Sequence, residues 1–174
     1  GTSANAGNAW DLAGRARANA NQAVFQNQCG ALIAETDQAN AARVRATAIT
    51  TSYDFGAAEA YARAAGNEVS VGNNDVYVEI DNTQFNSGGV DSTATFSGTN
   101  GYDVYVGADA VGNSVIGYAC SECAGYLTAT NVQTNNGSVT ASAHTTVAGS
   151  ARAVITGTNA VGNAATFYVS SPGP

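Results

Sequence analysis

Apolar and polar residues alternate over many short segments of this chain. Apolar residues occupy every second position in 76–80, and 104–108 repeats the pattern. A period of two is typical of β-strands with one buried face. Similar segments lie at 69–71, 90–96, 115–119, 126–130, 139–144, 153–156 and 165–169. The pattern predicts an all-β chain of short strands.

Two motifs alternate between these segments. Ala/Val-Gly-Asn occurs at 6–8, 65–67, 111–113 and 161–163. Gln-x-Asn/Gln-x-Gly-x-Leu/Val occurs at 26–32, 84–90 and 133–139. Successive corner glycines are evenly spaced, except for one longer step between Gly30 and Gly66. This even spacing predicts a structural repeat.

Gly and Asn suit sharp corners because both tolerate positive φ. Two short strands in one repeat cannot bury a face alone, so neighbouring repeats must stack. We predict a parallel β-solenoid with about 23–25 residues per coil, two short strands per coil, and one longer insertion in the N-terminal third. The insertion is expected at 35–42, as a short helix or a loop. Roughly seven coils would rise by about 34 Å. An antiparallel β-sandwich is the alternative, because it also has short, regularly spaced strands.

A single domain is expected for 174 residues, with divergent Ala-rich coils over 1–65 and regular coils over 66–174. Residues 56–67 align with 102–113 without a gap, which predicts a strand at 58–62. The net charge is −7 and no lysine is present, so nucleic acid is not an expected partner. No apolar stretch is long enough to cross a bilayer, which argues against a membrane span. The small residues of GTSANAG are typical of a mature secreted chain, so we expect an extracellular or cell-surface location.

Both ends of the predicted solenoid lack an evident cap. The first motif copy begins a few residues into the chain, and the last is followed by only half a coil. Uncapped coils expose strand edges, so we expect subunits to stack head to tail as a filament. The candidate interface residues are Trp10, Leu12, Phe167 and Val169.

The three cysteines predict one disulfide. Cys120 and Cys123 form a Cys-x-x-Cys without the strand–helix context of a redox motif or a second pair for zinc. A disulfide that pins a loop is the preferred interpretation. Cys29 is expected to be free, because coil counting places it too far from Cys120 for a disulfide.

No constellation of catalytic or metal-binding residues is evident, so we expect no enzyme, no metal and no cofactor. His144 is the only histidine, and no Gly-x-Ser-x-Gly elbow accompanies it. Four aspartates flank predicted strands and are interpreted as solvated strand ends rather than calcium ligands or a glycosidase pair: Asp75, Asp81, Asp103 and Asp109. Tyr77 and Tyr105 share an Asp-Val-Tyr-Val context and are candidates for outward stacking and for glycan binding.

The Gln-x-Asn-x-Gly-x-Val and Ala-Val-Gly-Asn repeats resemble those of the holdfast anchor protein D group of stalked alphaproteobacteria, over roughly residues 60–170. Curli-like repeat subunits are a weaker match. The resemblance implies a secreted, multimerising surface protein that fastens an adhesive polysaccharide to the envelope.

The preferred hypothesis is a structural subunit of an extracellular filament or surface anchor, with itself as partner and with extracellular polysaccharide or outer-surface proteins as possible further partners. The alternative is a secreted carbohydrate-binding or polysaccharide-cleaving solenoid. An ice-binding solenoid is disfavoured, because Thr128, Thr130 and Thr134 do not recur in register.

Overall fold

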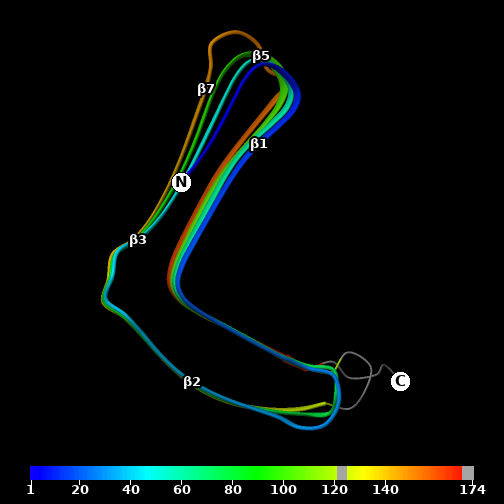
Figure 1. The fold of residues 1–174 in the computed structure, drawn as a ribbon, viewed down its shortest axis with the longest axis vertical. Coiled ribbons are helices and arrows are strands. Elements are labelled where there is room, and N and C mark those ends of the chain that lie inside the picture. Colours follow the sequence, from blue (N-terminus) through cyan, green and yellow to red (C-terminus); the bar gives the residue numbers. More distant parts are fainter. Residues whose placement is uncertain (121–124, 170–174) are drawn as a thin grey trace.

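Residues 1–120 and 125–169 are described by the computed structural model, which is a parallel β-solenoid (Figure 1). One sheet has the order β1-β3-β5-β7, with β8 also paired to β5, and the second has the order β2-β4-β6. All pairs are parallel, which confirms the predicted solenoid over the sandwich. Among the described residues, no helix is long and apolar enough to cross a membrane. The strands are β1 (Thr2–Asn27), β2 (Leu32–Asn40), β3 (Val44–Asn73), β4 (Tyr77–Asn86), β5 (Val90–Ala119), β6 (Tyr126–Asn135), β7 (Val139–Val147) and β8 (Ala153–Val169).

Each coil is about twice as long as predicted. Asn67 and Asn113 are stacked neighbours 46 residues apart, while Asn113 and Asn163 are 50 apart. The shorter predicted coil was wrong because the two motifs mark different corners of one coil. At these corners the Asn67 side-chain amide donates to the carbonyl of Phe85 at 2.9 Å. The rise of the chain is therefore about 17 Å, half of the predicted value.

The predicted insertion in the N-terminal third is also wrong. β2 (Leu32–Asn40) is a regular strand whose Gln38 stacks on Gln84 at a spacing of 46 residues. The motif copies at 6–8 and 26–32 were misassigned, because Asn21 and Asn40 occupy the columns of Asn67 and Asn86. The spacing instead lengthens later, to 49 residues between β4 and β6. Residues 121–124, between β5 and β6, lie outside the described residues.

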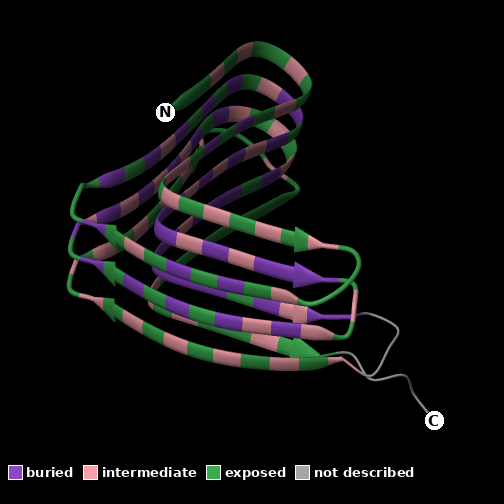
Figure 2. Cartoon of the chain, turned by 60° about the horizontal axis from the view of Figure 1, so that its bottom comes forward, coloured by how far each residue is buried: buried purple, intermediate pink, exposed green. Residues whose placement is uncertain are grey.

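The cross-section is L-shaped, with two thin arms that each contain a separate core (Figure 1). One core joins the first part of the long strands to their middle, and it is dominated by alanine with Val106 and Phe96. The second packs the ends of the long strands against β2, β4 and β6, around Val71, Val78 and Ile80. Small side chains are favoured because facing strands are close. Buried residues concentrate in the middle layers, and the outer layers are more exposed (Figure 2).

Amide ladders satisfy the polar interior between the two cores. One ladder joins Asn21, Asn67, Asn113 and Asn163 through bonds of 2.7–2.8 Å. Asn67 and Asn113 are fully buried. Each buried amide of this ladder therefore has partners, as a stable polar interior requires. Two further ladders contain Asn40, Asn86 and Asn135, and Gln38, Gln84 and Gln133.

Ion pairs join neighbouring coils on the outer surface. Asp91 accepts hydrogen bonds from Thr140 on one side and from Arg43 on the other. These bonds hold the pKa of Asp91 below its ordinary value, with the Thr140 hydroxyl as the largest cause. Burial raises the pKa of Glu68, but hydrogen bonds from Arg63 and Arg17 outweigh it, and the net pKa is lowered.

The solenoid is expected to lose stability in acid. A carboxylate with a depressed folded-state pKa stabilises the fold above its unfolded pKa, near 4, and this contribution is lost as pH falls through the folded value. We expect Asp91→Asn to flatten the decrease in melting temperature below about pH 4. Thermal melts from pH 7 to pH 2 measure how the melting temperature depends on pH. Glu35→Gln, on exposed β2, is the charge-matched control and should retain the wild-type slope; equal slopes for both variants would contradict the assignment.

Candidate functional site

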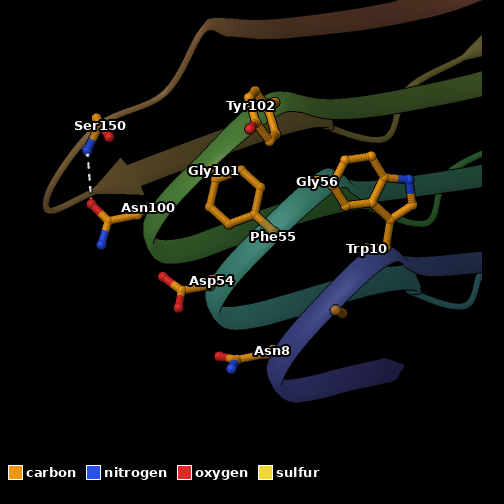
Figure 3. A pocket seen from close by; sticks show the side chains of 10 residues that line it. Asn8, Trp10, Asp54, Phe55, Gly56, Asn100, Gly101, Tyr102 and Ser150 are labelled. Atoms are coloured by element: carbon orange, nitrogen blue, oxygen red, sulfur yellow. Dashed lines mark hydrogen bonds between the residues drawn. The ribbon is translucent and has the colours of Figure 1, made fainter.

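An aromatic column crosses the coils at one corner of the solenoid (Figure 3). Trp10, Gly56 and Tyr102 occupy equivalent positions in successive coils, as the flanking strand pairs fix. Arg152 follows, because its backbone N–H donates to the carbonyl of Tyr102. Trp10 is 74% exposed and Tyr102 is 51% exposed. The column therefore presents aromatic surface to solvent.

Gly56 allows the two rings to meet. A Cβ at this position would lie 2.5 Å from the Trp10 carbonyl oxygen and 2.9 Å from its Cδ2 atom. The rings of Trp10 and Tyr102 meet edge to face, with centroids 5.9 Å apart. The Arg152 guanidinium lies 5.7 Å from the Tyr102 centroid, within cation–π range. A substitution at Gly56 would push the rings apart.

Polar groups line the groove beside the column. Asn8, Asp54 and Asn100 form a parallel column on the neighbouring position (Figure 3). The Arg152 guanidinium makes two hydrogen bonds to the Asp103 carboxylate. The Arg152 hydrogen bond is the largest cause that lowers the pKa of Asp103. Carboxylate and amide oxygens are thus held next to exposed rings.

The groove has two hollows side by side along the strand direction, and each one crosses successive coils. The first encloses about 560 Å³ over Trp10, Phe55 and Tyr102. The second encloses about 610 Å³ and includes Tyr105, which is 44% exposed, and Ile155. Exposed rings beside fixed hydrogen-bond acceptors suit a flat ligand with an apolar face and polar edges. A pyranose ring has this shape.

The predicted residues divide between different surfaces. Trp10, predicted as an assembly residue, belongs to the groove, with Leu12 half-buried in its second hollow. Phe167 packs half-buried against the second core, and Val169 is 41% exposed. Leu12 lies in the same hollow as Tyr105, which was predicted as a glycan-binding residue. Trp10 lines the adjoining hollow.

Tyr77 and Tyr105 do not stack on each other, contrary to the prediction. Tyr77 lies on β4 and stacks on Tyr126, with ring centroids 5.7 Å apart. Tyr105 lies on β5 and pairs with Glu59 and Ile155. The shared Asp-Val-Tyr-Val context misled because it occurs on two different strands of the coil.

The four aspartates that flank the predicted strands do not gather into one cluster. Asp75 accepts backbone N–H groups of Gly30 and Val76, and the Gly30 bond is the main cause that lowers the Asp75 pKa. Asp109 accepts from the Tyr61 hydroxyl; burial, and then this bond, raise the pKa of Tyr61 to about 12. In the described part of the chain, no three acidic, His or Cys side chains gather as a metal site would require.

The described residues include two of the three cysteines, Cys29 and Cys120. Cys29 is free and exposed at a corner of the first coil. Cys120 is buried and has a positive φ of 32°. Cys123 lies outside the described residues, so the predicted Cys120–Cys123 disulfide stays a prediction.

The outermost strands form a second candidate site at each end of the stack. β1 and β2 are outermost at one end, and β6, β7 and β8 are outermost at the other, among the described residues. An outermost strand has one row of backbone N–H and C=O groups without a strand partner. The described solenoid therefore has two open edges.

The amide ladders give these edges a direction. Asn21, Asn67 and Asn113 each donate an Nδ2 hydrogen to the next coil. Asn163 donates one Nδ2 hydrogen to the Gln133 carbonyl at 3.3 Å, which leaves its second Nδ2 hydrogen for the β8 edge. The Gln ladder runs the other way: Gln133 donates to Gln84, and Gln84 donates to Gln38. The Gln133 Oε1 acceptor is thus left for the outer side. The opposite edge, formed by β1 and β2, has groups complementary to these: the Asn21 Oδ1 acceptor and the Gln38 Nε2 donor.

Sequence reasoning missed Gly56, Tyr102 and Arg152 as groove residues. The available signal was the coil spacing: Gly56 lies 46 residues after Trp10 and Tyr102 lies 46 residues after Gly56, like the Asn ladder. With coils taken as half that length, Trp10 and Tyr102 were assigned to distant coils.

Comparison with known families shows which family the chain matches. A family model described as holdfast attachment protein D (HfaD) matches residues 1–89, just over half of the chain. The match begins earlier than the repeats on which the sequence resemblance rested, and the two overlap over residues 60–89. The predicted family is confirmed. No curated protein and no solved structure matches the chain.

Proposed function

The chain belongs to the holdfast attachment protein D family, and from this premise we propose that it is a structural, non-catalytic component of a cell-surface attachment assembly. Its coils stack on those of a second copy, head to tail, through the two open edges. The result is an extracellular filament or anchor that rises about 17 Å per described solenoid.

The complementary edges are the observation that carries this proposal. With β1 of a second copy one coil beyond β8, Asn21 follows Asn163 and continues the donor-to-acceptor ladder in the same direction. The described edge of β8 is 17 residues long and contains no charged residue. An edge without charge, proline or a bulge is a ready template for strand pairing. A head-to-tail contact of this kind propagates rather than closes.

Asn163→Asp tests the stacking. The aspartate retains an acceptor for the Asn113 amide, but it removes both Nδ2 hydrogens, one of which binds the Gln133 carbonyl while the other faces the next copy. We expect wild-type protein at high concentration to form filaments in negative-stain micrographs, and Asn163→Asp to remain as discrete particles. Asn136→Asp, at an exposed corner, introduces the same charge and should still form filaments. Discrete wild-type particles under all concentrations would contradict the proposal.

The aromatic groove supports a second function, binding of carbohydrate. The exposed Trp10 and Tyr102 rings beside Asp103 and Asn100 are the specific observation that favours it. Because the net charge is −7, we expect neutral glycans to bind better than acidic ones. This function is compatible with a surface anchor and does not depend on filament formation.

Fluorescence provides a direct test, because Trp10 is the only tryptophan. Titration with a neutral soluble glucan should shift the Trp10 emission and saturate, whereas an acidic uronan should not. Affinity electrophoresis in gels containing the glucan should show retardation of wild-type protein that Tyr102→Ala reduces at least tenfold. Tyr126→Ala is the control, since that tyrosine is 61% exposed outside the groove. Equal retardation of both variants would exclude the groove.

A further inference from the structure

The two sheets end at different layers of the stack. The long strands supply four layers at the positions of Asn21, Asn67, Asn113 and Asn163, the last on β8. The second sheet supplies three strands among the described residues, and it ends at β6. β8 therefore extends one layer past β6. Its Phe167 packs against the second core, and no described strand of the second sheet lies opposite β8 in its own layer.

The vacant position beyond β6 has a defined side-chain pattern. Five inward positions follow one another along each of the three strands, and residues at equivalent positions are of the same type. In chain order these positions hold an apolar residue, a small or branched apolar residue, Thr or Asn, Gln, and Asn. On β4, which has neighbours on both sides, Val78, Ile80, Asn82, Gln84 and Asn86 are at most 1% exposed. The equivalent residues on β6 are only half-buried: Leu127, Ala129, Asn131, Gln133 and Asn135.

The edge of β6 is also unprotected. Its ten residues include no charged residue and no proline. β2, outermost at the other end of this sheet, carries Glu35 and Asp37 on its exposed side. Charged side chains on an edge strand discourage pairing with another chain. The asymmetry favours β6 over β2 as the strand that accepts a partner.

We propose that the open edge of β6 binds one extended partner segment as a parallel strand. The segment has the chemistry of the ladder that it continues: Leu or Val, then Ala or Ile, Asn, Gln and Asn at alternate positions. Backbone hydrogen bonds to β6 hold it, the apolar residues cover Leu127 and Phe167, and its amides extend the Asn and Gln ladders. This mode of recognition is β-strand addition.

A second copy stacked as proposed above does not occupy this position. Its β1 would lie on β8, so its β2 would lie two layers beyond β6, about 9.6 Å away. That separation leaves room for one strand between them. Among the described residues of one copy, no strand fills the acceptor position, so this inference does not depend on filament formation.

A synthetic peptide with the β4 sequence YVEIDNTQFN is the probe. Fluorescence anisotropy with the wild-type full chain, at concentrations low enough to keep it monomeric, should show saturable binding. A scrambled peptide of the same composition should not bind. Absence of saturable binding, or equal binding of both peptides, would overturn the inference without bearing on filament formation.

Two matched variants locate the binding edge. Asn131→Asp retains the acceptor for the Asn82 amide but places a carboxylate where the outward amide was. Gln38→Glu does the same at the β2 edge, where it retains the acceptor for Gln84. We expect Asn131→Asp to weaken peptide binding at least tenfold and Gln38→Glu to leave it within twofold. The reverse result would move the site to β2 and overturn the assignment to β6.

Discussion

Replacing Gly88 by alanine is expected to lower the free energy of unfolding by about 2–3 kcal/mol. A Cβ at Gly88 would lie 2.0 Å from the backbone oxygen of Ala42 in the coil below. This neighbour is backbone, which cannot rotate away as a side chain can, so the two coils must separate locally. The same column continues at Gly137, whose Cβ would lie 1.9 Å from the Gly88 oxygen.

Urea unfolding followed by circular dichroism measures this effect at low protein concentration. Gly157→Ala is the control, because a Cβ at Gly157 meets no atom within 4 Å. Alanine there removes the conformational cost of glycine in a strand, so stability should stay unchanged or rise by up to about 1 kcal/mol. A similar loss at both positions would show that general strand propensity, rather than the approach of two coils, decides the result.

The same close contact explains why an insertion was predicted from the sequence. Gly88 and Gly137 are equivalent residues at one corner, and in the first coil this position is occupied by Ala42. Alanine is tolerated there because no described coil lies beneath Ala42. A search for Gly at this corner therefore passed over 38–44 and found Gly30 instead. That one difference created the apparent long step between Gly30 and Gly66 and the insertion that does not exist.

The solenoid itself was predictable because its physical requirements are local. Small residues, alternating strands and Asn-Gly corners each follow from close packing of parallel layers. The repeat of two different corner motifs was also visible. What the sequence left open was which copies stack on each other, because the two motifs alternate at almost half of the true coil length.

Long-range charge pairs contain information that resolves this choice. Arg43 and Asp91 are 48 residues apart, and Arg15 and Glu59 are 44 apart. Both separations are close to the spacing of 46 residues in the Asn ladder. A coil of half that length would place these partners two layers apart, beyond the reach of an ion pair. The groove residues were missed for the same reason, since Trp10 and Tyr102 approach each other only when Gly56 alone lies between them.

The amide ladder provides the other large expected effect. Asn113→Ala should lower the free energy of unfolding by about 3 kcal/mol, because it leaves buried polar groups without partners. Asn113 donates to the Thr134 carbonyl at 2.9 Å and to Asn163 at 2.8 Å, and it accepts from Asn67. Asn163→Ala is the matched control in the same ladder. Since Asn163 is exposed, water replaces its partners and the cost should stay below about 1 kcal/mol.

Asn113→Asp separates lost hydrogen bonds from lost volume. The ionised side chain still accepts from Asn67 but faces the oxygens of Thr134 and Asn163 with no hydrogen to donate. Burial beside these acceptors should raise the folded-state pKa of the new carboxyl group. A raised pKa stabilises the protonated fold, so stability should be greatest below about pH 4 and fall as pH rises through the folded value. This trend is opposite to the acid sensitivity expected of the wild-type chain. Urea midpoints between pH 3 and pH 7 measure it, and a parallel decrease for both proteins in acid would show that the ladder at Asn113 is open to water.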